Sequence, residues 1–357
     1  MRRTPALALF LVAATAAAYG EEKAWDRDAA AGYLDARAEM WVKRSRARQE
    51  LTTACVSCHT AMPYLLSRAS LSSMPQPGED LLTDVETRVT HWNDAKVWYD
   101  TDEGEEKPAQ SWGTESVINA LVLTMRDRRA GGGVSEEAKT ALEHMWKRQS
   151  DDGDWPWLHF ALGPWEADGA DYWGASLAAI AAMSAAREVK PPAEARAKLR
   201  SYLRSGLTSE MSPHNRLALL WAASAWDGLL SNVEKSRLVD DVLEHQQPDG
   251  GFRLPDLAPW PSEDKTPPSQ VSDGYATAFT TFVLQRVDEP SAADAVARGV
   301  SWLEQNQMED GRWETLSLNM DRSQQEPFRR LLMSDAATAF AVLALTSETS
   351  EPKPTEP

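Results

Sequence analysis

Gln246-Gln-Pro-Asp249-Gly250-Gly-Phe252 is one of three segments that share the pattern Gln-x-x-Asp-Gly-x-aromatic. The other two are Gln149-Ser-Asp-Asp152-Gly153-Asp-Trp155 and Gln307-Met-Glu-Asp310-Gly311-Arg-Trp313. The segments at 246 and 307 begin 61 residues apart, and the sequence Ala-Thr-Ala-Phe recurs with the same spacing at 276–279 and 337–340. A fixed internal period is the signature of a repeat architecture, so we expect a chain built from similar units.

Each motif lies between two segments of helical character. The segment before it is amphipathic: Val239, Val242 and Leu243 fall on one face of residues 232–246. The segment after it, such as 275–284, is apolar nearly all round and is therefore expected to be buried on every side. The Asp-Gly pair supplies the turn between them, because glycine tolerates positive φ. Each unit is thus predicted to be a hairpin with a half-buried outer helix and a fully buried inner helix.

Six such hairpins are predicted between residues 21 and 346. The outer helices are expected at 29–49, 80–92, 135–149, 193–205, 232–246 and 291–305, and the inner helices at 59–71, 112–126, 173–186, 213–229, 273–285 and 334–346. Neither end carries the polar cap that an open solenoid needs, so the hairpins are expected to close into a ring. The predicted fold class is all-α, an (α/α)6 toroid with Gln-x-x-Asp-Gly-x-Trp turns.

These repeats, together with Trp-Gly-Thr-Glu at 112–115, resemble the squalene/oxidosqualene cyclase and protein prenyltransferase superfamily over roughly residues 80–346. The resemblance implies the toroid but neither family activity. Cyclases protonate their substrate with Asp-x-Asp-Asp leading into Thr-Ala, and the residues in that place here are Ser334-Asp335-Ala336-Ala337. The Asp, Cys and His zinc ligands of the prenyltransferases are also missing, because both cysteines lie elsewhere.

The strongest chemical motif is Cys55-Val-Ser-Cys58-His59, which has the Cys-x-x-Cys-His spacing of c-type haem attachment. In that chemistry the two thiols add to the haem vinyl groups and the imidazole becomes the proximal iron ligand. The sequence therefore predicts haem c on Cys55 and Cys58, with His59 as the proximal ligand, in the turn of the first hairpin (21–75). A disulfide stays open as an alternative. A thioredoxin-like pair would want a βαβ context, and a zinc site a second cysteine pair.

The second iron ligand is less well defined by the sequence. Met320 is our first choice, because it lies in the long loop after Trp313 on the expected haem-bearing rim, with His91 next. An open or water-bound iron is an equally good expectation. For His91, His159 and His214 a structural role is the better prediction.

The ends and the composition bear on location and partners. Residues 1–20, with Arg2, Arg3 and the small-apolar run 6–18, have the form of a signal peptide, which predicts a periplasmic or secreted protein. No later run is long enough to span a bilayer, and residues 347–357 are expected to be a disordered tail. A net charge of −17 argues against nucleic-acid partners, and two cysteines exclude a multi-bridge disulfide scaffold.

Two functions follow from these observations. The main prediction is an exported c-type haem protein on a toroid (residues 21–346), working in electron transfer or redox chemistry with a redox partner protein. The alternative is an enzyme or binding protein of the toroid superfamily that acts on a hydrophobic or carbohydrate ligand, without haem and with Cys55 and Cys58 as a disulfide.

Overall fold

The computed structural model describes residues 24–46, 51–208, 210–265, 267–321 and 323–347. In these ranges the regular structure is helical, apart from one isolated bridge between Leu162 and Glu166. The predicted signal peptide lies outside the described residues, and so does the predicted tail apart from Ser347. None of the described helices combines the length and the apolar character needed to cross a bilayer.

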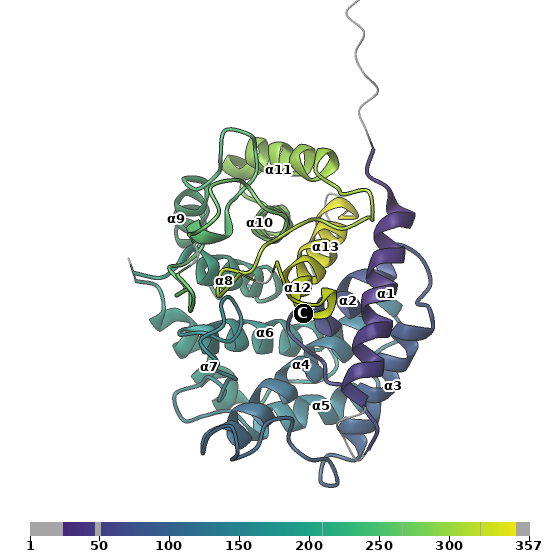
Figure 1. The fold of residues 1–357 in the computed structure, drawn as a ribbon. Coiled ribbons are helices and arrows are strands. Elements are labelled where there is room, and N and C mark those ends of the chain that lie inside the picture. The colour runs from purple at the N-terminus through teal and green to yellow at the C-terminus, as the bar shows by residue number, and fades with distance from the viewer. Residues whose placement is uncertain (1–23, 47–50, 209, 266, 322, 348–357) are drawn as a thin grey trace, which may run out of the picture.

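The helices form the predicted toroid (Figure 1). The inner helices are α2 (Ala61–Ser67), α4 (Lys107–Ala130), α6 (Ala170–Ser184), α8 (Pro213–Ala225), α10 (Gly274–Val287) and α13 (Leu332–Leu345). The outer helices are α1 (Arg27–Arg46), α3 (Gln76–Thr90), α5 (Glu136–Lys147), α7 (Ala193–Ser205), α9 (Asn232–Leu243) and α11 (Ala293–Gln305). Each inner helix packs on the next, and α13 packs on α2 and α1, so the ring is closed. The predicted (α/α)6 fold class is confirmed.

Short elements fill the connections between these helices. They are η1 (Arg68–Ser70), η2 (Leu254–Asp256), η3 (Pro290–Ala292) and α12 (Pro327–Arg330). The helix α4 begins five residues before the expected residue 112, because Pro108 occupies a first-turn position where its missing N–H costs nothing. The predicted inner helix 59–71 is divided into α2 and η1.

Aromatic rings fill the centre of the toroid. Trp173, Tyr275, Phe279 and Phe340 are all 0% exposed. The ring of Phe279 lies 5.4 Å from that of Trp173 and 5.0 Å from that of Phe340, both in edge-to-face arrangements. Such pairs add about 0.5–1.5 kcal/mol each beyond the area that they bury. At the height of these four rings, therefore, the inner helices surround a packed aromatic core.

The Gln-x-x-Asp-Gly-x-aromatic turns fasten each unit to the next. The Nε2 atom of Gln246 donates to Gly250 O (2.8 Å) in its own turn and to Ala295 O (2.9 Å) at the start of the following outer helix. Gln149 makes the same two bonds, to Gly153 O at 3.0 Å and to Ala195 O at 3.1 Å. The glutamine of the motif thus makes the same pair of hydrogen bonds in both turns, one within its own turn and one to the next unit.

The glutamine of the third motif makes the corresponding hydrogen bonds across the closure of the ring. Gln307 Nε2 donates to Gly311 O (3.0 Å) and to Asp26 O (2.9 Å), which joins unit six to unit one. Gly311 has a φ of 89° and packs so tightly that a Cβ there would lie 2.1 Å from Ala29 O. Only glycine fits both the left-handed backbone and this close approach.

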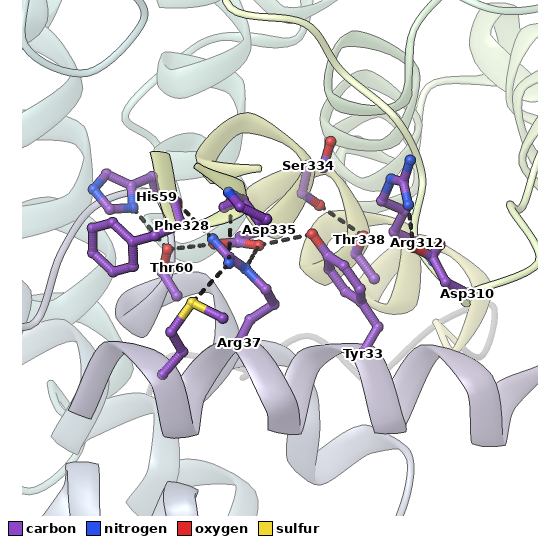
Figure 2. A network of polar contacts seen from close by, with 12 residues as sticks. Tyr33, Arg37, His59, Thr60, Asp310, Arg312, Phe328, Ser334, Asp335 and Thr338 are labelled. Carbon is purple, nitrogen blue, oxygen red and sulfur yellow. Dashed lines mark hydrogen bonds and ion pairs between the residues drawn. The ribbon is translucent and has the colours of Figure 1, made fainter. Parts of the chain in front are cut away.

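A buried ion pair reinforces the same seam (Figure 2). Arg37 on α1 donates from Nε to Asp335 Oδ1 (2.6 Å) and from Nη2 to Asp335 Oδ2 (2.9 Å), and the Asp335 carboxylate on α13 also accepts from Tyr33 (2.9 Å). The two charged side chains are 5% and 1% exposed. Helices from opposite ends of the chain are therefore held together by a fully desolvated, bidentate contact.

Candidate functional site

The candidate site lies at the end of the toroid where the inner helices begin. Because every outer helix leads through a turn into its inner helix, the turns and the inner-helix N-termini share this end, called the rim below. The positive ends of the inner-helix dipoles are thus gathered at the rim. Three long connections, 148–169, 244–273 and 306–331, also lie there.

Asn319 locks these connections together. Its side chain exchanges two hydrogen bonds with the backbone of Gly163, each 3.0 Å long, and its carbonyl oxygen accepts from Glu263 N at 2.7 Å. The ring of Trp260 covers Gly163 so closely that a Cβ there would lie 2.3 Å from Trp260 Cγ. Irregular segments from three units are therefore held in one arrangement, which lets them position side chains for binding.

A pocket of about 290 Å³ opens on the rim between α4 and α6. Its lining combines an aromatic ring, two carboxylates, a histidine and an amide with small apolar groups. We call it the rim pocket, and its residues are Gln110, Trp157, Leu158, His159, Ala167, Asp168, Gly169, Ala170 and Asp171.

Trp157 is fixed in this lining by two contacts. Its Nε1 atom donates to Trp165 O at 2.8 Å. Its ring rests on α6 at Gly174, where a Cβ would lie 2.2 Å from Trp157 Cε3. The absence of a side chain at Gly174 therefore lets a large ring lie against the helix backbone, and the ring is only 5% exposed.

The polar groups of the rim pocket are also anchored. His159 Nε2 lies 2.8 Å from Asp168 Oδ1, which makes an acid–imidazole pair at the pocket wall. Asp171, in the first turn of α6, accepts a hydrogen bond from the hydroxyl of Tyr202 on α7. Gln110 Oε1 accepts from Lys107 Nζ (3.0 Å) and from the backbone N–H of His159 (3.3 Å).

Glu166 lies between Trp165 and the pocket residue Ala167 but is not itself part of the lining. Burial raises the pKa of its carboxyl to about 7, although the Lys107 ammonium opposes this shift. Burial raises the pKa of the Cys55 and Cys58 thiols, and the charge of Glu166 raises it further. Glu166 is thus a carboxyl group able to exchange a proton near neutral pH.

The structure buries one of the two predicted haem-attachment cysteines, Cys58, and leaves Cys55 half-buried. Cys58 is 4% exposed and belongs to the apolar core, and burial raises the pKa of both thiols. Trp41 Nε1 donates to Cys55 O at 2.6 Å and so fixes the turn. A haem bonded to both thiols would have to displace the packing around Cys58.

His59 faces different neighbours from the two thiols. Its Nδ1 atom is 2.8 Å from Thr60 Oγ1, and its ring packs edge-on against Trp41 at 4.9 Å. The Thr60 hydroxyl donates its proton to Asp335 Oδ2 (2.7 Å), so its oxygen accepts from the N–H at His59 Nδ1 (Figure 2). His59 is thereby joined to the buried pair that closes the ring.

The remaining predicted residues lie apart from one another. Met320 is half-buried, and its sulfur accepts from Gln325 Nε2 at 3.7 Å. His91 ends α3 and contacts Thr87 O at 3.1 Å. His214 is buried against Tyr275, and burial lowers its pKa to about 4, so it is neutral at physiological pH.

Comparisons with known proteins identify the scaffold. No family model matches the chain, and no curated protein matches it by sequence. The unsaturated glucuronyl hydrolase of Bacillus sp. GL1, described as responsible for glycosaminoglycan degradation, matches with a TM-score of 0.55 and 12% identity over 90% of this chain and 97% of that one. An unsaturated glucuronyl hydrolase specific for heparin matches with a TM-score of 0.53 and 10% identity over 90% and 96% of the chains.

A terpene cyclase also resembles the chain, though less well. The type II enzyme MstE from Scytonema matches with a TM-score of 0.49 and 13% identity over 90% of this chain and 98% of that one. At identities this low, the glucuronyl hydrolases show a shared α/α toroid and not a shared chemistry.

These findings correct the main functional prediction. The prediction of a haem protein in electron transfer is wrong: the solved structures that match this chain with TM-scores above 0.5 include unsaturated glucuronyl hydrolases. The covalent haem c itself, on Cys55 and Cys58 with His59 and Met320 as iron ligands, is not tested by these comparisons and stays a prediction.

Sequence reasoning missed the residues of the rim pocket. A usable signal was present, because Trp155-Pro-Trp157 places a second tryptophan two positions beyond the motif aromatic. Trp155 is fully buried and donates to Met145 O at 2.7 Å, as a turn aromatic should, whereas Trp157 lines a pocket. The pairing of His159 with Asp168 depends on how the connection folds and has no counterpart in the spacing.

Proposed function

We propose that the chain is a carbohydrate-processing enzyme whose sugar site is the rim pocket. The observation that carries this proposal is the composition of the pocket wall, in which Trp157 stands with His159, Asp168, Asp171 and Gln110. A sugar ring has hydroxyl groups that hydrogen-bond carboxylates and amides, and apolar C–H groups that contact apolar side chains in the wall of a pocket. The volume of about 290 Å³ suits one small ring.

The fold supports this proposal without establishing it. Toroids of the same architecture include glycan hydrolases, and the rim pocket lies at the end where the inner-helix dipoles converge. The resemblance to cyclases concerns the scaffold only. Asp335, the remaining acid of the cyclase position, is held by Arg37, Tyr33 and Thr60, and Ala336 and Ala337 beside it are 0% exposed.

In the proposed reaction, water adds across a glycosidic bond, with one proton delivered to the departing oxygen. Hydrolysis of this kind uses two carboxyl groups in most enzymes that perform it. The rim pocket provides Asp168, paired with His159, and Asp171, held by Tyr202. Of these, we assign proton transfer to the His159–Asp168 pair, in which an imidazole nitrogen and a carboxylate oxygen lie 2.8 Å apart at the pocket wall.

The proposal is tested by incubating the protein with a panel of oligosaccharides and measuring the reducing ends released. We expect Asp168→Asn to lower the rate by about 10²–10⁴-fold, as for loss of a proton-transfer group. Asp151→Asn is the matched control, because Asp151 is an equally exposed aspartate paired with Lys198 (3.1 Å) outside the pocket. If no glycan is bound or cleaved, or if both variants behave alike, the proposal is wrong.

Export to the periplasm or beyond, predicted from residues 1–20, suits an enzyme that meets extracellular glycans and stays a prediction. The redox partner expected for an electron-transfer protein has no part in this proposal.

A further inference from the structure

The charges of the rim pocket point to a particular class of sugar. Its lining includes two carboxylates, Asp168 and Asp171, and neither lysine nor arginine. The pocket belongs to a chain of net charge −17, so the wider field has the same sign. A carboxylate-bearing sugar entering the pocket would therefore meet like charges and neither lysine nor arginine to pair with. The positive end of the α6 dipole also faces the pocket, but it already has the Asp171 carboxylate beside it in the first turn of the helix.

Lys107 is the cation that contacts the pocket wall from behind, and it is already engaged. Its Nζ atom donates to His159 O and to Gln110 Oε1 (3.0 Å), and it lies 4.4 Å from the centre of the Phe160 ring. The side chain is 7% exposed. Lys107 therefore supports the wall of the rim pocket from behind and does not present its ammonium group to a ligand.

The carboxylates, by contrast, have acceptor capacity left. A carboxylate offers about four lone-pair sites. Asp168 shares Oδ1 with His159 while its side chain stays fully exposed at the pocket mouth, and Asp171 accepts one bond from Tyr202. Both are therefore able to accept further hydrogen bonds from ligand hydroxyl or ammonium groups, and bonds from ammonium groups are the stronger.

We infer that the rim pocket takes amino sugars in preference to neutral sugars and discriminates against uronic acids. This inference rests on the proposed function and narrows its substrate class. It departs from the similar structures, one a hydrolase responsible for the degradation of glycosaminoglycan and the other a hydrolase specific for heparin. The fold is shared with those hydrolases, whereas the charge of this pocket belongs to the present chain.

Three β-1,4-linked tetrasaccharides provide a matched set of probes. They are cellotetraose, the fully deacetylated glucosamine tetramer and the glucuronic acid tetramer, which differ only at carbon 2 or carbon 6. Binding is measured by calorimetry at pH 6.0 and low salt. We expect the glucosamine tetramer to bind at least about tenfold more tightly than cellotetraose, and the glucuronic acid tetramer at least about tenfold more weakly. Raising the salt concentration should reduce both differences.

The variants Asp168→Asn and Asp171→Asn should each reduce the ratio of the glucosamine-tetramer affinity to the cellotetraose affinity about tenfold, because the asparagine amide can still hydrogen-bond a hydroxyl group but no longer carries the charge that attracts an ammonium group. Asp151→Asn should leave all three affinities unchanged. Circular dichroism establishes that each variant is folded.

The outcomes separate this inference from the proposed function. If the glucuronic acid tetramer binds as tightly as cellotetraose or better, the inference is wrong and the carbohydrate site stands. The inference also fails if the preference for glucosamine persists in both pocket variants. If none of the three probes binds and no other glycan is bound or cleaved, the proposed function fails together with the inference.

Discussion

Protonation of Glu166 makes the stability of the folded chain depend on pH. Burial raises the pKa of its carboxyl from 4.5 to about 7, so the folded chain binds a proton there more tightly than the unfolded chain does. The stability that this proton provides is fully present below pH 4.5 and is lost as the pH rises through about 7. The shift corresponds to on the order of 3 kcal/mol of unfolding free energy.

We therefore expect Glu166→Gln to be more stable than the parent chain at pH 8, by roughly 2–3 kcal/mol, and equally stable at pH 4. Urea unfolding followed by circular dichroism at the two pH values measures this difference. Glu263→Gln, at an exposed glutamate in a neighbouring loop, is the control and should change neither value. A Glu166→Gln variant with the same stability as the parent at pH 8 would contradict the raised pKa of this carboxyl.

The two cysteines make a second prediction at this scale. Because the thiolate is the reactive form and burial raises the pKa of both thiols, Cys55 and Cys58 should react slowly with a thiol reagent at pH 8 in the folded protein. Both should react at once in denaturant. The intact mass, measured alongside, tests the haem c prediction: a mass increased by one haem, with no reactive thiol in denaturant, would establish the attachment and contradict the free thiols.

At the scale of elements, the turn motif holds neighbouring units together. Gln307→Ala removes the hydrogen bonds to Gly311 O and Asp26 O, and we expect it to lower the unfolding free energy by about 1–3 kcal/mol. Gln305→Ala is the control, because Gln305 is exposed and bonds only one turn back, to Ser301 (2.8 Å). Equal stabilities of the two variants would show that the hydrogen bonds of Gln307 contribute nothing to the unfolding free energy.

The repeats explain why so much of the fold follows from the sequence. The alternation of half-buried and fully buried helices is encoded locally, by period and by composition, and α7 spans the predicted residues 193–205. The Gln and Gly of each motif are in contact with the next unit, so the unit length is encoded as well. The long connections carry no such repetition, which is why α12 and the lock at Asn319 were not foreseen.

Less of the site could be predicted, because most of the residues that line it lie in these connections, which carry no repetition. A pocket wall depends on which side of a connection each residue faces, and His159 and Asp168 meet only because residues 160–166 turn back on themselves. The Cys-x-x-Cys-His spacing, in contrast, is a strong local signal but says nothing about burial. The structure shows that Cys58 belongs to the core, and this could not be read from the spacing.

For the whole molecule, ring closure distinguishes this chain from an open array of hairpins. The closing contacts join residues about 300 positions apart, as in the bond between Arg37 and Asp335. A similar buried pair, Arg88 with Glu115, joins α3 to α4 within one unit and has no part in closure. The two pairs therefore separate the effect of losing an ion pair from that of opening the ring.

We expect Arg37→Met and Arg88→Met each to lower the unfolding free energy by about 3–5 kcal/mol, because each leaves a buried carboxylate without its partner. Native-state hydrogen exchange should differ between them. Arg37→Met should raise exchange along α1 and α13 first, since the seam opens before the rest of the ring, whereas Arg88→Met should raise it in α3 and α4.

The double change Arg37→Met with Asp335→Leu should recover part of the loss in unfolding free energy, because no unpaired charge remains at the seam. If Arg37→Met raises exchange evenly over all the helices, the toroid unfolds as one unit and the seam is not its weakest point.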